Sequence, residues 1–322
     1  MKAIIFGCGR MGRVRADALR DLDVGVAGLY DPDAKRAAEL AQAVGADRVL
    51  ASATEPWPDA DLVFVCTPPD SHGTLASRAA AMGMSIFIEK PLALSVEDAL
   101  PLAEAARRAG VICAVGNMNR LRPSVLALRE RFASAAPFAI AAHWVGSRYA
   151  VPWWGDITRS GGGFHEQGVH VVDLLAFLAG PVREVSAMRS DESAETDPTA
   201  VAIAFLLRSG CVATFTYSYL SPERSIELGF FSTVGAARLS GWSFDLQAAG
   251  DTIDGNGGEL DRNWIFRRET AWFVNGVRDG ELPPEMADIE AALATQRVMD
   301  AIREAYRTRR VIAVPAAPGG GT

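Results

Sequence analysis

The sequence predicts an α/β protein in which a doubly wound parallel sheet is followed by an α+β domain with a mostly antiparallel sheet. Three observations support this fold class. Short apolar segments alternate with helical patterns over residues 1–120, as in parallel sheets covered by helices. A glycine-rich turn joins the first apolar segment to the first helix. From residue 121 to 313, alternating apolar and polar residues are typical of antiparallel strands.

Length and composition fit a globular protein of two domains. The 322 residues are 49% hydrophobic and 22% charged, with a net charge of −7. No basic block indicates nucleic-acid binding, and no apolar run approaches the roughly 20 residues that span a bilayer. We therefore expect neither nucleic acid nor a membrane as partner. The widely spaced Cys8, Cys66, Cys113 and Cys211 are typical of buried thiols in a cytoplasmic protein, and we expect no metal site.

The chain opens with a strand, a glycine turn and a helix. The segment AIIF (3–6) leads into Gly7-Cys8-Gly9-Arg10-Met11-Gly12, and a second strand ends at Asp31. This order is the dinucleotide-binding fingerprint. Gly7 permits a tight turn, Gly9 lets the backbone approach a pyrophosphate, and Gly12 lets the helix pack closely on the strand. The first N–H groups of the helix are available to phosphates.

Asp31 indicates which dinucleotide binds. Its carboxylate would accept hydrogen bonds from the adenosine ribose and repel a 2′-phosphate, so we expect NAD. Lys35 and Arg36 follow closely and would tolerate a phosphate, which leaves NADP as an alternative.

The β-α alternation continues to residue 116. We expect further strands over residues 48–52, 62–67, 84–88 and 111–116, and helices over residues 33–43, 72–82 and 95–110. Ligands of such sheets bind at the carboxyl ends of the strands. The polar or turn residues at or just beyond those ends, which we expect to contact the cofactor, are Thr67, Pro68, His72, Glu89, Lys90 and Asn117.

The second domain is expected to contain strands and three helices. Hairpin turns are expected at 209–210 and 234–235, and helices over 163–178, 264–278 and 286–308. In VATFTYSY, Phe215, Tyr217 and Tyr219 share one side of a strand, and this aromatic face is a candidate surface for a homodimer or homotetramer. We expect the tail, 314–322, to be disordered.

Several motifs follow one another in a characteristic order. After the glycine turn come VFVCTPPDSH (63–72), IEKPLA (88–93), NRLRP (119–123) and GGGFHEQGVHVVDLL (161–175). With this set, which spans nearly the whole chain, the sequence resembles the glucose–fructose oxidoreductase, inositol dehydrogenase and MocA family (Gfo/Idh/MocA). The resemblance implies an N-terminal Rossmann domain, a C-terminal domain on a mostly antiparallel sheet, and NAD(P)-dependent redox chemistry at one carbon of a sugar, cyclitol or related polyol.

The same resemblance implies catalytic roles by position. Lys90 matches the family's catalytic lysine and His170 its proton-transfer histidine. Glu166 stands four residues earlier, where the family often has aspartate. Glu166, His170 and Asp173 lie at i, i+4 and i+7, on one helical face. Asp173 is expected to brace His170 or a backbone N–H.

Each of these residues also has a structural interpretation. Lys90 would be a solvated lysine in a turn, and Glu166 would form an i,i+4 pair on a solvated helix face. His170 would bond a backbone carbonyl or Asp173. The residues themselves leave these alternatives open.

A second group of residues is less specific. Arg120 matches a family position and is expected either to pair with a carboxylate or to contact substrate. Trp153 and Trp154 would stack on a sugar or on nicotinamide, although buried aromatic residues are commoner. His72 would contact the cofactor, cap its helix or pack in the core.

Alcohol oxidation requires a hydride acceptor, a base and a group that stabilises the alkoxide. A neutral histidine suits the base and a lysine the oxygen, so we expect an oxidoreductase with a polyol or sugar substrate. The alternatives are an NAD-binding regulator or sensor without turnover, and another reaction of the same fold such as elimination or the reduction of an imine or enone.

Overall fold

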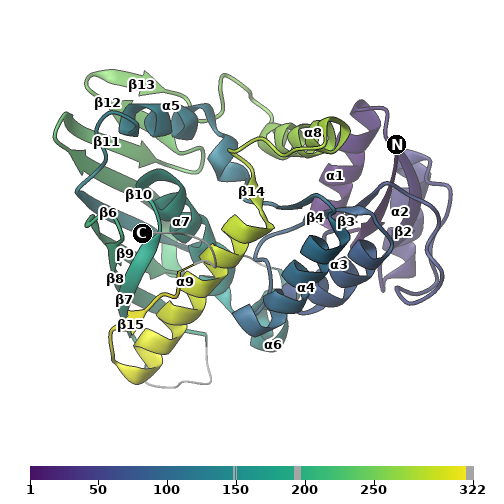
Figure 1. Ribbon diagram of the computed structural model, residues 1–322, viewed down its shortest axis with the longest axis horizontal. Coiled ribbons are helices and arrows are strands. Elements are labelled where there is room, and N and C mark those ends of the chain that lie inside the picture. Colours follow the sequence, from purple (N-terminus) through teal and green to yellow (C-terminus); the bar gives the residue numbers. More distant parts are fainter. Residues whose placement is uncertain (148, 150, 192–196, 317–322) are drawn as a thin grey trace. The chain divides into compact units, whose positions relative to one another are not determined.

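The computed structural model describes residues 1–147, 149, 151–191 and 197–316. They form two compact units, which Figure 1 labels by element: residues 1–118 with 263–291, and residues 119–262 with the chain after 291. From the sequence we expected everything after residue 120 to lie outside the first domain. The segment 263–291 returns because helix α8 (Trp264–Asp279) packs on α1 (Arg10–Asp21) and β14 (Ala287–Asp288) pairs with β5 (Cys113–Val115).

The first unit is built on a six-stranded sheet in the order β14-β5-β4-β3-β1-β2, with only β14 antiparallel to its neighbour. Its other strands are β1 (Lys2–Phe6), β2 (Gly25–Tyr30), β3 (Leu62–Val65) and β4 (Ser85–Ile88). Its other helices are α2 (Ala34–Val44), α3 (His72–Ala81) and α4 (Val96–Ala109), with a 3-10 turn η1 (Pro69–Ser71). The strand order reverses between β1 and β3, where parallel sheets of this kind bind their ligands.

Local sequence signals set the ends of these helices. Asp33 caps α2 by accepting the N–H groups of Lys35 and Arg36, and Gly45 ends it at a φ of 67°. Ser95, the first residue of the helix expected over 95–110, caps α4 by accepting the N–H of Asp98.

The prediction of a strand over residues 48–52 is wrong. Only Val49 forms an isolated bridge, to Leu29 of β2. The hydroxyl of Ser52 accepts the N–H groups of Thr54 and Glu55 and turns the chain away from the sheet. The first unit therefore has five parallel strands in place of the six expected.

The second unit is built on a nine-stranded sheet in the order β13-β12-β11-β10-β6-β9-β8-β7-β15. Among the described residues of this sheet, β6 and β9 pair in parallel and every other neighbouring pair is antiparallel. The strands are β6 (Ala139–Ser147), β7 (Val182–Arg189), β8 (Ala200–Leu207), β9 (Val212–Ser218), β10 (Leu220–Ser232), β11 (Gly235–Ser240), β12 (Asp245–Ala248), β13 (Asp251–Ile253) and β15 (Ile312–Ala313). The helical elements are η2 (Met118–Leu121), α5 (Pro123–Phe132), η3 (Pro152–Gly155), α6 (Ile157–Ser160), α7 (Gly163–Ala179) and α9 (Ile289–Thr308).

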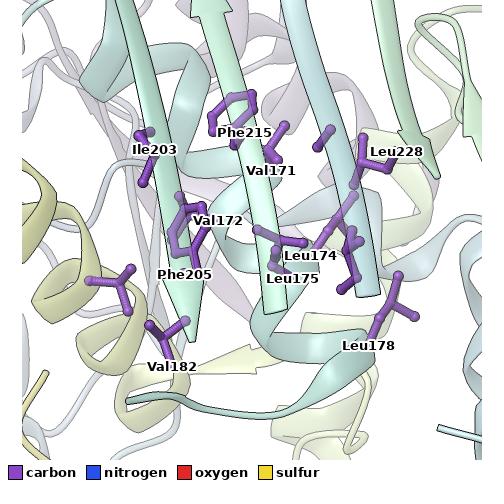
Figure 2. Packing of buried hydrophobic residues seen from close by; sticks show 14 of the residues in the cluster. Val171, Val172, Leu174, Leu175, Leu178, Val182, Ile203, Phe205, Phe215 and Leu228 are labelled. Atoms are coloured by element: carbon purple, nitrogen blue, oxygen red, sulfur yellow. The ribbon is translucent and has the colours of Figure 1, made fainter. Parts of the chain in front are cut away.

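Helix α7 covers one face of this sheet and closes its core. Val171, Val172 and Leu175 pack among Phe205 and Phe215 of the strands, as Figure 2 shows. All five side chains are at most 3% exposed. Burial of such side chains stabilises the fold by roughly 1.5–3 kcal/mol each.

The expectation that the aromatic side of β9 is an open surface for subunit association is wrong. Phe215 and Tyr217 are fully buried under α7, where both rings contact Phe164, and the Tyr217 hydroxyl donates to Gln167. A period-2 pattern defines two faces of a strand but does not say which one a helix covers.

The chain remains ordered beyond residue 313. Strand β15 pairs with β7, and the buried Val314 donates its N–H to the carbonyl of Arg183. The expected disorder of the tail is therefore wrong for Val314, while residues 317–322 lie outside the described residues. Nowhere in the described chain does a helix combine the length and apolarity needed to cross a membrane.

Candidate functional site

The glycine turn after β1 is tightly packed at Gly7 and Gly12 and open at Gly9. A Cβ on Gly7, at a φ of 91°, would lie 2.5 Å from the carbonyl oxygen of Cys66, and one on Gly12 would lie 1.9 Å from that of Gly7. A Cβ on Gly9, by contrast, would point into open space, with no atom within 4 Å. The N-cap, Gly9, brings no side-chain hydrogen bond to α1, which begins at Arg10. An open backbone at an uncapped helix N-terminus fits the pyrophosphate of a dinucleotide.

Asp31 lies immediately after β2 and is 7% exposed. Its Oδ2 accepts the N–H of Cys8 at 2.8 Å and its Oδ1 that of Asp33 at 2.9 Å. The Arg36 guanidinium lies 3.6 Å from Oδ1. The backbone therefore fixes the carboxylate beside the glycine turn, as a ribose-binding acid requires. Of the two cations expected to tolerate a 2′-phosphate, Arg36 lies beside this carboxylate.

His72 does not offer a nitrogen to a ligand. Its side chain is fully buried, Nε2 lies 2.8 Å from the carbonyl oxygen of Thr67, and Nδ1 lies 3.1 Å and 3.2 Å from those of Pro91 and Leu92. Burial lowers the pKa of the imidazole, although these carbonyl oxygens oppose the change. The imidazole ties the loop after β3, which includes Pro68, to the loop after β4. Of the three roles considered for His72, packing in the core is the one that its surroundings support, and its ring holds two loops together.

Glu89 and Lys90 follow β4 but have different surroundings. Glu89 is 7% exposed and Lys90 is half-buried, and the Lys90–Pro91 bond is cis. Asn117, beyond the end of β5, is buried at 5% exposure. Together with Thr67 these residues lie at the carboxyl edge of the parallel strands, where the sequence predicted them.

A buried ion network that sequence reasoning missed holds Glu89. Arg15 of α1 lies 2.8 Å from Glu89 Oε1 and 2.6 Å from Glu269 Oε2, donates to Thr270, and stacks 4.3 Å above the Phe87 ring. Burial acts to lower the pKa of the guanidinium, but the two carboxylates raise it, so Arg15 is charged. The only sequence signal was a charged residue on the apolar stripe of α1.

Two glycines set the start of α7. Gly161 and Gly162 have φ values of 73° and 96°. A Cβ on Gly162 would lie 2.3 Å from Asp197 Oδ1, and one on Gly161 would lie 2.6 Å from the His165 ring. Asp197 accepts the N–H of Gly163 at 2.8 Å. The glycines therefore allow a left-handed turn packed tightly under neighbouring side chains.

The polar residues of α7 are not on a solvated face. Glu166 and Asp173 are each 2% exposed and His170 is 6% exposed, and every residue from 163 to 175 is buried. The His170 ring is stacked with Trp144 of β6, with 5.9 Å between ring centroids and planes 14° apart. This burial argues against the interpretation of Glu166 as one half of a surface pair.

Asp173 pairs with Arg120, a partner that was not expected from the sequence. Arg120 donates two hydrogen bonds to the carboxylate, at 2.8 Å and 2.6 Å, and Thr295 donates a third at 3.2 Å. The Arg120 guanidinium also lies over the Phe177 ring. This bidentate pair supports the structural interpretation of Arg120 over contact with substrate.

The paired tryptophans contact other rings. Trp154 is 8% exposed and meets Tyr149 edge-on, with 5.1 Å between centroids. Trp153 is half-buried and packs on Trp154. Packing is therefore the better-supported role of Trp154. Within the described residues, no three His, Cys, Asp or Glu side chains are grouped to hold a metal ion.

Comparison with known proteins agrees with this architecture. Residues 1–117 match the model of an oxidoreductase family with an NAD-binding Rossmann fold, and residues 135–238 match the GFO/IDH/MocA C-terminal domain. The chain belongs to the Gfo/Idh/MocA family. Its first 117 residues are therefore an NAD-binding Rossmann domain, as the sequence predicted.

The similarity to individual proteins is moderate. The chain is 30% identical to scyllo-inositol 2-dehydrogenase (NAD(+)) of Bacillus subtilis over 56% of this chain and 54% of that protein. It is 28% identical to UDP-N-acetylglucosamine 3-dehydrogenase of Acidithiobacillus ferrooxidans over 72% and 71% of the two chains. Thus the chain matches little more than half the length of the inositol dehydrogenase. GenD2 from gentamicin A biosynthesis, solved with NAD, has the same fold, with a TM-score of 0.83 at 21% identity over 98% and 97% of the chains.

Proposed function

We propose that this family member is an NAD(P)-dependent oxidoreductase that transfers a hydride between nicotinamide and a secondary alcohol or ketone carbon of a sugar, cyclitol or related polyol. The observation that carries the proposal is the burial of Glu166 and His170 together on α7. Burying an acid and an imidazole costs free energy, and active sites are where such groups are concentrated, although structural pairs such as Arg120–Asp173 are buried too. The named activities of the two curated relatives support the same class of reaction.

The cofactor would be held by the first unit. The turn from Gly7 to Gly12, with Arg10 and Met11, would bind the pyrophosphate, and Asp31 the adenosine ribose. Bound NAD supplies the hydride acceptor.

His170 is proposed as the base that takes the hydroxyl proton, because a histidine pKa lies near working pH. Glu166 would stabilise the imidazolium that results. The Lys90 ammonium would donate a hydrogen bond to the substrate oxygen and stabilise negative charge there as the carbon is oxidised. The same groups serve the reduction, with the proton moving from His170 to oxygen.

A panel of polyols and sugars, assayed with NAD and with NADP by the absorbance of the reduced nicotinamide, tests the proposal. Turnover of at least one compound is expected. Binding of NAD without turnover of any compound would favour the regulator, and turnover with no net change in absorbance would favour elimination.

We further propose that the protein is cytoplasmic and forms a homodimer or homotetramer through the sheet face opposite α7. All four cysteines are free. Met188 and Val212 are 71% and 54% exposed, and Thr214 and Thr216 lie exposed on the side of β9 away from α7. Light scattering of the wild type and of Met188→Glu tests the interface, since a buried charge there should shift the protein towards monomer.

A further inference from the structure

Aromatic rings lead from His170 to an exposed arginine within the second unit. Trp144 stacks on His170, and Trp242 meets Trp144 with 5.9 Å between centroids. The guanidinium of Arg224 lies over Trp242, 4.8 Å from its centroid, and over Tyr149 at 5.5 Å. Trp144 lies on β6, Arg224 on β10, and Trp242 in the turn that follows β11. These three strands are neighbours in the sheet (Figure 1).

Arg224 lies on the same face of the sheet as His170. A Cβ built on Gly146 would lie 3.6 Å from Arg224 Cγ, so the side chain of Arg224 covers this glycine. Gly146 follows Trp144 by two residues on β6, and both therefore point towards the α7 side. The absence of a side chain at position 146 leaves the space in which the arginine stem lies.

The guanidinium contacts two rings but no carboxylate of the described residues. The residue is exposed, and among the described residues no carboxylate lies within ion-pair distance of it. Two ring faces attract the cation and restrict its orientation, but they do not use its N–H donors. A fixed fork of N–H donors beside exposed aromatic surface suits a carboxylate or a phosphate on a ring-shaped ligand.

We propose that Arg224 and the half-buried Trp242 form a substrate subsite that selects anionic sugars, meaning those that carry a carboxylate or a phosphate group. This inference rests on the proposed oxidoreductase function, because it assigns a substrate class to the surface at Trp242, which the Trp144 ring connects to His170. The Trp242 ring packs against the sugar, and Arg224 binds the anion. Neutral polyols make only the ring contact and bind more weakly.

Binding is measured first, without turnover. The full chain saturated with NADH is titrated with D-glucose, D-glucuronate, glucose 1-phosphate and UDP-glucose, following tryptophan fluorescence and heat. At least one anionic probe should bind at least about tenfold more tightly than glucose. Preference for glucuronate identifies a carboxylate, and preference for glucose 1-phosphate or UDP-glucose a phosphate. Equal or tighter binding of glucose would overturn the proposal.

Variants assign the selectivity to Arg224. Arg224→Gln should remove the preference for the anion, Arg224→Lys should retain part of it, and glucose binding should change less than about twofold. Arg238→Gln is the matched control, because Arg238 is an exposed arginine of β11 that pairs with Glu227. If Arg224→Gln behaves like Arg238→Gln, Arg224 has no such role. Selective binding without turnover of any probe would support the subsite and count against the oxidoreductase. Turnover of neutral polyols alone would support the oxidoreductase and count against the subsite.

Discussion

The carboxylate of Glu89 and the guanidinium of Arg15 form a buried ion pair, with 2.8 Å between Oε1 and Nη2. Glu89 directly precedes Lys90, the lysine proposed to stabilise the substrate oxygen. Arg15 also binds Glu269 of α8, so one guanidinium connects the first helix, the end of β4 and a helix that arrives about 250 residues later. The loop that carries Lys90 is thus anchored on the core of the Rossmann unit.

Arg15→Met should destabilise the protein severely. The substitution leaves two buried carboxylates without their cation, and breaking such a group costs about 3–5 kcal/mol. Urea unfolding measures the loss. Arg20→Met is the control on the same helix, where an exposed pair with Asp17 is worth less than about 1 kcal/mol. Similar losses in the two variants would show that the buried network contributes little.

His72 should make the free energy of unfolding decrease as the pH falls below about 6.5. Because burial lowers its pKa in the folded state, the unfolded chain takes up a proton below about pH 6.5 that the folded chain does not. This contribution to stability is fully present above that pH and decreases below it. Urea midpoints at about pH 7.5 and 5.5 should therefore differ less in His72→Gln than in the wild type. The same difference in His72→Gln as in the wild type would contradict this role of His72.

The cysteine thiols should react slowly while the protein is folded. Burial, assisted by the Asp31 carboxylate, raises the pKa of Cys8 to about 12, and burial raises that of Cys113 to about 12. The pKa values of Cys66 and Cys211 are also raised by burial. Titration with a disulfide reagent at about pH 8 should modify the native thiols slowly and all four rapidly in denaturant. Fast modification of native Cys113 would contradict its burial.

Asp31→Ala should weaken NAD binding more than NADP binding. In the proposed site the carboxylate would accept ribose hydroxyls, and its loss would also remove a charge that repels a 2′-phosphate near Arg36. Calorimetric titration with each dinucleotide measures both affinities. An equal loss for the two would mean that Asp31 serves only the turn, through Cys8.

Sequence predicted the features that depend on neighbouring residues. The glycine turn, the starts of two helices at Asp33 and Ser95, and the shared face of Glu166 and His170 all follow from local spacing. Contacts between distant residues were not predictable in this way. Arg15 and Glu269 are 254 residues apart, and the partner of Asp173 lies 53 residues away. No local pattern specifies such pairs.

The errors have the same origin. The segment at Val49 has strand-like residues, but the Ser52 turn ends its pairing after one bridge. Tyr217 was expected on an open aromatic face, but α7 covers that face. In the first case a turn at the end of the segment decided the structure, and in the second a helix from elsewhere in the chain did.

The most direct test of the proposed chemistry compares His170→Ala and Lys90→Ala with the wild type on whichever polyol or sugar the wild-type protein oxidises. Steady-state turnover and NAD affinity are measured on the same preparations. The proposed roles predict that turnover falls by at least about 100-fold in each variant while NAD still binds. Near-normal turnover in both variants would contradict the assignment of proton transfer to His170 and of oxygen stabilisation to Lys90.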